Sequence, residues 1–226
     1  MALTEYFDRE AGRFASDYDT DPRFRERAML WASLIDRHAG VARTCLDLGC
    51  GPGVQARVAA ARGLATVAID LSAAMIARVP ASANLDARVG DFMTADLAPA
   101  DLVLCSSVLE YADNLERAIA RIAMLVREGG AVLASLPNPQ CLFRRAERIA
   151  FRITGRPAYL RYVGPPVPLA EARGWFAAHD LRCRELVYYA RFAPLIPDVL
   201  AANLAVFVLD KVSNRSTNVR ATSASS

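Results

Sequence analysis

Two hydrophobic periodicities alternate along the middle of the chain. Short apolar runs that end at Gly, Asp or Ser predict buried strands, whereas stretches with apolar residues every three or four positions predict helices. The predicted strands are Thr44–Gly49, Ala65–Asp70, Asp86–Val89, Leu102–Ser106, Ala131–Leu136, Cys183–Tyr189 and Ala205–Lys211. The predicted helices are Arg23–His38, Val54–Arg62, Ala73–Val79, Asn114–Val126 and Leu169–His179, with Arg127–Gly130 as a glycine-rich helix stop. This alternation predicts an α/β fold with a mostly parallel sheet.

The alternation stops after Leu136, and the segment 137–168 reads as an insertion. It contains an amphipathic helix that ends at Gly155, with Leu142, Ala146, Ile149, Ala150 and Ile153 on one face and Arg144, Arg148 and Arg152 on another. Arg145, Arg156 and Arg161 add to the positive charge, which only Glu147 opposes. Such a helix can be a lid, a membrane-surface contact, a clamp on an anionic substrate, or a solvated face packed on the sheet.

The length of 226 residues suits one domain. We expect it to span residues 1–212, with 1–40 as an N-terminal helical cover, and we expect the polar tail 213–226 to be disordered. The net charge of +3 is too small to indicate a nucleic-acid partner, and no RNA-binding appendage is visible. The apolar stretch 192–209 contains prolines and an aspartate, which makes it a poor membrane span.

The five cysteines are scattered, and no Cys/His spacing indicates a metal site. Cys45 and Cys105 lie inside apolar runs, where a free cysteine packs as a small hydrophobe. The N-terminus is charged from Glu5 onward and lacks the apolar core of a signal peptide. We therefore expect a reducing, cytoplasmic location.

The stretch "LDLGCGPG" joins the first predicted strand to a helix through Gly49, Gly51 and Gly53. A dinucleotide fingerprint needs a glycine where this chain has Val54, and a P-loop sequence is absent. Asp47, inside the strand, is unfavourable for a pyrophosphate but can accept hydrogen bonds from a cationic amino group. Asp70 ends the next strand about 20 residues after the glycines, where a carboxylate suits a ribose diol.

These motifs resemble those of class I S-adenosylmethionine-dependent methyltransferases. The similarity runs through "LDLGCGPG", "AIDLSAAMI", "VGDFMTADL" and "DLVLCSSVLEYADNLERAIARIAMLVREGGAVLAS" to "FVLDKV", and covers residues 44–136 with specific motifs. It implies a Rossmann-like sheet of seven strands, mostly parallel with the last antiparallel, and helices on both faces. It also implies S-adenosylmethionine as the cofactor.

The resemblance assigns cofactor roles position by position. Gly49, Gly51 and Gly53 let the backbone approach the methionine part; Asp47 helps to hold its amino end; Asp70 holds the ribose hydroxyls; Leu71 packs on the adenine; Asp91 faces the adenine amino group beside Phe92; Ser106 lines the cofactor and substrate side; Cys50 and Met75 complete the set. Taken singly, the glycines can be an ordinary strand-to-helix turn, and each acid a solvated loop residue. Their joint order at successive strand ends favours the cofactor.

A methyl sulfonium is already activated, so the protein must mainly align a nucleophile and exclude water. His38 and His179 are expected at the amino edge of the sheet, whereas ligands bind at the carboxyl edge. Glu110 and Tyr111 follow the fourth strand and are the candidate catalytic residues. Related small-molecule methyltransferases often read "LEH" where this chain reads "LEY", so a histidine base is missing.

The N-terminal "EYFDREAGRFASDYDTDP" resembles the opening of ubiquinone-biosynthesis and Mg-protoporphyrin methyltransferases, whose first helices cover the cofactor. Tyr6, Phe7, Phe14 and Tyr18 are candidates for this cover or for ordinary core packing. The candidate substrate residues are Tyr6, Tyr18, Arg144, Arg148 and Arg152.

We predict methyl transfer to a small-molecule acceptor, through an oxygen rather than a carbon or nitrogen. The acceptor is expected to be anionic or lipid-linked, with peripheral membrane contact as a further hypothesis. The place of the [DNS]PP[YFW] motif of nucleobase-amine enzymes reads "SSVL", which disfavours that class. A non-catalytic S-adenosylmethionine-binding scaffold and, less favoured, an NAD-type oxidoreductase are the alternatives.

Overall fold

The computed structural model describes residues 2–193 and 195–212, so the predicted tail lies outside the described residues. The strands are β1 (Thr44–Leu48), β2 (Ala65–Asp70), β3 (Leu85–Val89), β4 (Ala100–Cys105), β5 (Val126–Pro137), β6 (Leu181–Arg191) and β7 (Ala202–Lys211). The helices are α1 (Leu3–Thr20), α2 (Pro22–His38), α3 (Val54–Ala61), α4 (Ala73–Ile76), α5 (Leu115–Leu125), α6 (Leu142–Thr154), α7 (Leu169–Ala178) and α8 (Asp198–Ala201), with short 3-10 turns η1 (Leu109–Tyr111) and η2 (Ala158–Arg161).

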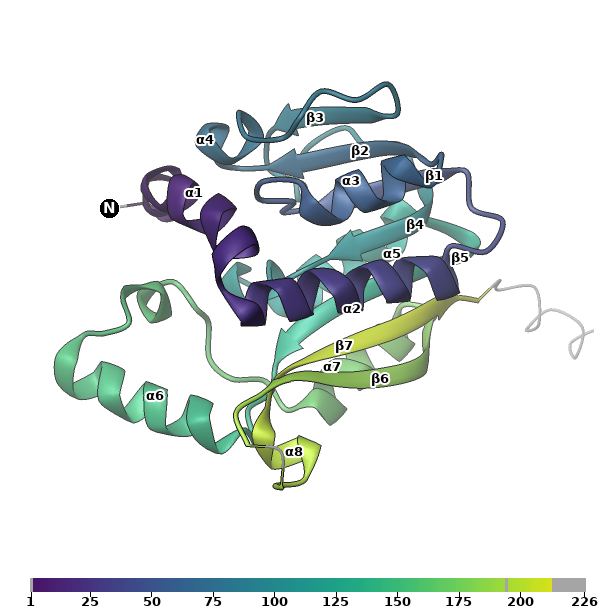
Figure 1. Cartoon of the computed structure of the whole chain (residues 1–226). Coiled ribbons are helices and arrows are strands. Elements are labelled where there is room, and N and C mark those ends of the chain that lie inside the picture. The colour runs from purple at the N-terminus through teal and green to yellow at the C-terminus, as the bar shows by residue number, and fades with distance from the viewer. Residues whose placement is uncertain (1, 194, 213–226) are drawn as a thin grey trace, which may run out of the picture.

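The strands form one seven-stranded sheet in the order β3-β2-β1-β4-β5-β7-β6 (Figure 1). β1 to β5 pair in parallel, and β7 inserts antiparallel between β5 and β6. The predicted Rossmann-like sheet with an antiparallel last strand is therefore confirmed. The strand order reverses between β1 and β4, the place where open α/β sheets bind ligands.

Both faces of the central strands are buried, and successive residues of these strands enter opposite layers. Leu102 and Leu104 pack with α2 and α3, whereas Val103 and Cys105 pack with α5 and α7. In Figure 1, α2 and α3 lie in front of the sheet and α5 and α7 behind it. Burial on both faces explains why the central strands read as continuous apolar runs rather than as an alternating pattern.

The predicted helix stop between the helix Asn114–Val126 and the strand Ala131–Leu136 is wrong in one detail. The helix α5 ends at Leu125 and β5 begins at Val126, so Arg127–Gly130 belongs to the strand and not to a separate helix stop. The register shifts between Ala100 and Leu102 opposite this stretch, and Gly129 has a φ of 75°. The glycines therefore serve an irregular strand start.

Two segments extend beyond the carboxyl ends of the parallel strands, towards which the arrows in Figure 1 point. The first is α1, which packs against α2 and α4. The second is α6 with η2, and α6 packs against α8. Gly155 ends α6 in the left-handed conformation, as predicted from its position. None of the described helices has the length and apolar character that a membrane span requires.

Candidate functional site

A cavity of about 620 Å³ lies at the carboxyl ends of β1, β2 and β4, beneath α1. The glycine turn, the acids that follow β2 and β3, and η1 form its floor. Aromatic residues of α1 and α2 and polar residues of α6, β6 and β7 complete the wall. The cavity therefore occupies the edge of the sheet at which the sequence places the cofactor.

The glycine turn needs its glycines for two different reasons. Gly49 and Gly53 have φ values of 65° and 73°, and an added Cβ would lie 2.3 Å from Val108 Cγ2 and 2.9 Å from Val79 Cγ1, respectively. At Gly51 a Cβ would meet nothing within 4 Å, although φ is 53°. Gly51 thus presents an open backbone to the cavity, which Gly49 also lines, while Gly49 and Gly53 allow close packing against Val108 and Val79.

Asp70 lines the cavity and is held by its neighbours. Its Oδ2 accepts a hydrogen bond from the Gly51 backbone N–H at 2.8 Å, and its Oδ1 accepts one from the Ser72 N–H at 2.9 Å. Burial raises the pKa of Asp70. A carboxylate oriented by two backbone donors keeps lone pairs for ribose hydroxyls, which fits the predicted role.

Ser72 also connects this acid to the N-terminal helix. Its hydroxyl donates to Asp8 Oδ1 at 2.6 Å and accepts from the Met75 N–H at 3.1 Å as the cap of α4. This hydrogen bond lowers the pKa of Asp8. Asp8 therefore fixes α1 directly above the Asp70 end of the cavity.

Asp47 is fully buried behind the glycine turn and does not itself line the cavity. Neither of its carboxylate oxygens has a hydrogen-bond partner within normal distance, although the Ala56 backbone amide is close enough to lower the pKa. Burial outweighs this effect and raises the pKa to about 7. A buried acid without close partners is suited to receive hydrogen bonds from a cationic group that binds nearby.

We expect Asp47→Asn to stabilise the free protein by about 2–3 kcal/mol more at pH 8 than at pH 5, because a raised native pKa penalises folding. The penalty is absent below the ordinary aspartate pKa, grows as pH rises towards about 7, and is complete above it. Thermal unfolding of parent and variant at pH 5 and pH 8 measures the effect. Equal differences in melting temperature at the two pH values would argue against this assignment.

The other predicted cofactor residues divide clearly. Cys50, Leu71, Met75, Asp91, Phe92 and Ser106 line the cavity, whereas Gly53 lies behind it. Asp91 Oδ1 accepts from the Met93 N–H at 2.8 Å, which fixes the carboxylate at the end of β3. The structure thus brings most of the predicted cofactor residues to one cavity, while the contact of each residue with the cofactor remains a prediction.

Arg27, on α2, is a site residue that the sequence does not reveal. Its Nη2 donates to the Ser106 carbonyl oxygen at 2.9 Å and to Ser106 Oγ at 2.7 Å. It also lines the cavity. Arg27 is one of several charged residues in the first turns of α2, so no local pattern distinguishes it.

The far end of the cavity is polar and comes from distant segments. It contains Glu110 of η1, Arg144 of α6 and Asn203 of β7. Arg144 is only 7% exposed, and its Nε donates to the Asn203 carbonyl oxygen at 3.1 Å. Arg144 Nη1, Glu110 Oε2 and Asn203 Oδ1 are buried atoms without a hydrogen-bond partner. Such atoms are suited to bind polar groups of a ligand.

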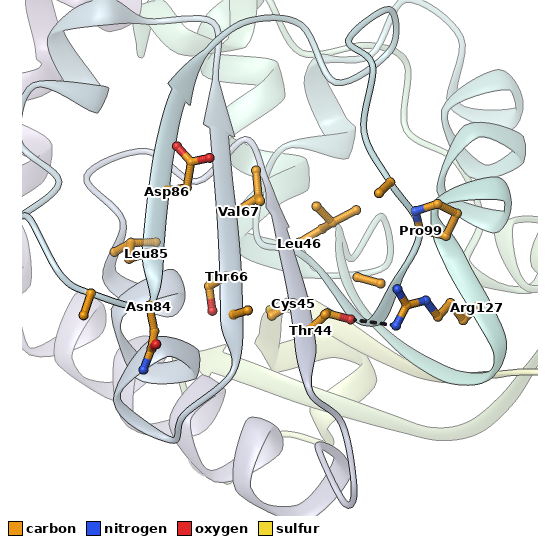
Figure 2. A pocket seen from close by; sticks show the side chains of 14 residues that line it. Thr44, Cys45, Leu46, Thr66, Val67, Asn84, Leu85, Asp86, Pro99 and Arg127 are labelled. Carbon is orange, nitrogen blue, oxygen red and sulfur yellow. Dashed lines mark hydrogen bonds between the residues drawn. The ribbon is translucent and has the colours of Figure 1, made fainter.

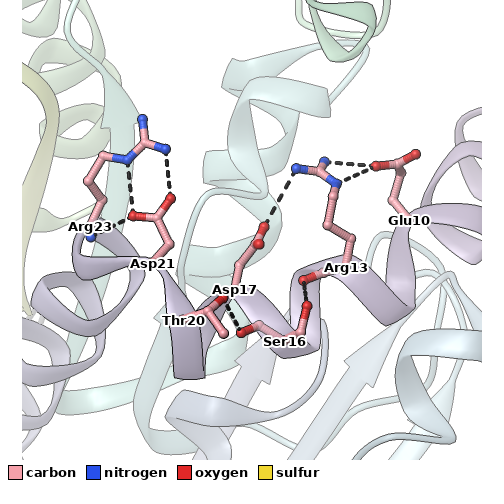
Figure 3. Close-up of polar contacts among 7 residues, drawn as sticks. All are labelled: Glu10, Arg13, Ser16, Asp17, Thr20, Asp21 and Arg23. Carbon is pink, nitrogen blue, oxygen red and sulfur yellow. Dashed lines mark hydrogen bonds and ion pairs between the residues drawn. The ribbon is translucent and has the colours of Figure 1, made fainter.

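The three other arginines of the cavity already have partners. In the part of the chain that the structure describes, Arg27 has no carboxylate within 4.0 Å, but its Nε and Nη2 donate to Ser106, and the other two arginines pair with carboxylates. Arg13 lies 2.7 Å from Glu10 and 3.5 Å from Asp17, and Arg23 lies 2.6 Å from Asp21 (Figure 3). Among the described residues, Arg144 has no carboxylate within 4.0 Å, although it lowers the pKa of Glu110 from a greater distance. Arg144 is therefore the cavity cation best placed to bind an anion.

Arg148 and Arg152 do not share this position. Arg148 donates to the Gly164 carbonyl oxygen at 3.4 Å, and Arg152 is exposed; neither lines the cavity. His38 and His179 are also absent from its wall. The predicted aromatic residues Tyr6, Phe7, Phe14 and Tyr18 do line it, and Phe7 contacts Tyr111 with ring centroids 5.1 Å apart.

A second hollow of about 360 Å³ lies near the amino ends of β1, β2 and β3 (Figure 2). Its lining cation is already engaged: Arg127 Nη1 donates to Asp101 Oδ1 at 3.0 Å and to Thr44 Oγ1 at 3.3 Å. Burial opposes ionisation of Asp101, but hydrogen bonds from Arg43, Thr44 and Arg127 bring its pKa down to about 2. These contacts connect the amino ends of neighbouring strands and are structural. The first cavity is therefore the candidate functional site.

Residues 23–185 match the model of a protein family described as a methyltransferase domain. The chain belongs to this family. The match includes the glycine turn, Asp70, Asp91 and η1. S-adenosylmethionine is accordingly the cofactor of this methyltransferase, and the open backbone at Gly51, the oriented Asp70 and the unpartnered Asp47 fit it.

Curated relatives share part of this methyltransferase. A ubiquinone biosynthesis O-methyltransferase of Aromatoleum aromaticum is 34% identical over 133 residues, which cover 54% of this chain and 57% of the relative. A malonyl-[acyl-carrier protein] O-methyltransferase of Pectobacterium atrosepticum is 31% identical, with 58% and 54% covered. The chain thus spans little more than half the length of these relatives.

Solved structures agree with the fold. Magnesium protoporphyrin IX methyltransferase of Synechocystis, solved with bound S-adenosylhomocysteine, has a TM-score of 0.72 at 14% identity and covers 92% of this chain and 98% of its own. The N-methyltransferase NodS of Bradyrhizobium japonicum has a TM-score of 0.66 at 16% identity, with 93% and 98% covered. At these identities the similarity establishes the shared fold.

Proposed function

We propose that this methyltransferase transfers the methyl group of S-adenosylmethionine to an oxygen of a small anionic acceptor. The observation that carries the proposal is the division of one cavity into two ends. The glycine turn and Asp70 form the cofactor end, and the unpaired Arg144 lies at the other. A guanidinium that is buried without a carboxylate partner favours an acceptor that brings a negative charge.

The cofactor supplies an activated methyl group, so the residues of the chain mainly orient the acceptor. Both Asp70 and Arg144 line the cavity, and in this proposal Asp70 holds the ribose while Arg144 holds the acceptor's anionic group. The aromatic rings of α1 line the same cavity and reduce its access to water. Holding both reactants in one water-poor cavity provides catalysis by proximity and orientation.

Glu110 is the proposed proton acceptor when the acceptor oxygen arrives as a hydroxyl. Burial raises the pKa of Glu110, although Arg144 and Arg27 oppose the effect. A carboxylate with a raised pKa is a stronger base than an ordinary glutamate. Burial also raises the pKa of Tyr111 well above its ordinary value, so this phenol stays neutral and can donate a hydrogen bond to the acceptor.

We expect Arg144→Ala to raise the KM for an anionic acceptor by roughly tenfold, which corresponds to one charge-assisted hydrogen bond. Arg152→Ala is the matched control from the same helix, and should leave the KM for a water-soluble acceptor unchanged because Arg152 lies outside the cavity wall. S-adenosylhomocysteine formation across phenolic and carboxylic acceptors measures both, while calorimetry follows cofactor affinity.

Two results would contradict the proposal. An equal KM for the Arg144 and Arg152 variants would remove the anion-binding role, provided that the cofactor affinity of each is intact. Cofactor binding without S-adenosylhomocysteine formation by any acceptor would instead favour the non-catalytic alternative.

A further inference from the structure

The helix α6 turns its apolar stripe towards solvent. The exposed fractions are 44% for Leu142, 46% for Phe143, 59% for Ile149 and 80% for Ile153. The opposite face of α6 carries its polar contacts. Arg144 is buried there, and Glu147 accepts a hydrogen bond from the Tyr159 hydroxyl at 2.7 Å.

This orientation reverses the usual amphipathic arrangement. Burying apolar surface contributes about 25 cal/mol per Å², so a helix normally turns its apolar stripe inward. Here the inward side supplies Arg144 to the cavity, and the neighbouring α8 and η2 are only short segments. Within the described residues, nothing covers Ile149 and Ile153.

Positive charge borders the apolar stripe. Arg145 and Arg152 are exposed along one side of α6, and Arg156 is exposed just beyond its end. Glu147 is the acid of this helix, and it is occupied by Tyr159 on the inward side. Phe192, which is 44% exposed, contacts Phe143 with ring centroids 6.2 Å apart and extends the apolar surface.

We propose that the outward face of α6, with Phe192, docks on an anionic lipid surface. Isoleucine and phenylalanine side chains can enter the boundary between headgroups and acyl chains, while flanking arginines bind anionic headgroups. A second copy of the chain fits less well, because a two-fold contact on this face would bring like-charged arginines together.

The docking face adjoins the cavity. Phe143 is half-exposed and also lines the cavity. When α6 docks on lipid, this part of the cavity wall therefore lies at the lipid surface. An acceptor with an apolar tail can then pass between lipid and cavity without crossing water. The docking itself does not depend on the identity of the acceptor.

Vesicle sedimentation with the full chain tests the proposal. Vesicles of phosphatidylcholine alone are compared with vesicles that contain phosphatidylglycerol, at low and high salt. We expect binding to the anionic vesicles and weakening by salt. The double substitutions Ile149→Ser with Ile153→Ser, and Arg145→Glu with Arg152→Glu, should each weaken binding by roughly tenfold or more.

Matched controls change the same residue types elsewhere. Val41→Ser with Met124→Ser alters apolar side chains that are 96% and 62% exposed on other surfaces. Arg57→Glu with Arg117→Glu reverses the charge of two exposed arginines outside α6. Both control pairs should bind as the parent does.

Three outcomes would overturn the proposal: no binding to anionic vesicles, equal weakening by the control pairs, or undiminished binding by the α6 variants. Light scattering tests the alternative that a second copy of the chain binds this face, because it measures the oligomeric state. A dimer that is lost in the Ile149 and Ile153 variant would make this face a self-interface and would likewise overturn lipid docking.

Discussion

Gly49→Ala should lower the stability of the protein by roughly 2–5 kcal/mol and abolish measurable cofactor binding. An alanine at a φ of 65° costs about 1–2 kcal/mol. Its Cβ would also lie 2.3 Å from Val108 Cγ2, and relieving such overpacking costs about 1–3 kcal/mol more. The shift would move the backbone between Asp47 and Gly51, on which the cofactor end depends.

Two variants separate strain from collision. Gly63 has a φ of 84°, and an added Cβ meets nothing within 4 Å, so Gly63→Ala should show the backbone cost alone. Val108 Cβ would itself lie 2.6 Å from the added Cβ, so the rescue must remove it: Gly49→Ala with Val108→Gly should recover the part of the stability lost through the collision. Thermal unfolding and S-adenosylhomocysteine calorimetry measure both effects. A Gly49 variant as stable as the Gly63 variant would show that the turn tolerates a side chain.

Glu110→Gln should lower kcat for a hydroxyl acceptor by about 100-fold, as expected on removal of a general base. In the parent, the pKa of Glu110 is raised, so the carboxylate is protonated at low pH and the rate should rise as pH increases through that raised pKa. The variant should lack this limb of the pH–rate profile. The KM for cofactor should not change, because Glu110 belongs to the far end of the cavity.

Asp113→Asn is the matched control, since Asp113 also lines the cavity but is exposed. It removes the same charge without removing a buried base, and its pH profile should follow that of the parent. A Glu110 variant that loses rate but keeps the parent's pH limb would reduce Glu110 to a positioning residue.

The grouping of the candidate cofactor residues at one edge of the sheet could be predicted because these residues are local to strand ends. Gly49, Gly51 and Asp70 follow apolar runs that fix their position, and parallel strands bring such ends to one edge. The acceptor end could not be predicted in the same way. Arg27 and Asn203 come from α2 and β7, and only the tertiary fold brings them to one wall.

Within α6, the sequence identifies the helix but not its rotation. Arg144, Arg148 and Arg152 form one periodic set, yet only Arg144 reaches the cavity. The usual rule that the apolar stripe faces inward would have turned all three away from the protein. The rotation of α6 depends on tertiary contacts of Arg144, which donates to the Asn203 carbonyl oxygen and lies at the end of the cavity that contains unpartnered polar atoms.

With Asp70 holding the cofactor as proposed, the contact between Asp8 and Ser72 couples the N-terminal helix to the cofactor. Ser72 binds Asp70 through its backbone and Asp8 through its hydroxyl, so a displacement of either carboxylate is felt by the same residue. Thermodynamic coupling is reciprocal. If a bound cofactor stabilises the packing of α1 over the cavity by a given free energy, then α1 in that position increases the affinity for the cofactor by the same free energy. The stability of α1 over the cavity and the affinity for the cofactor therefore report the same coupling free energy.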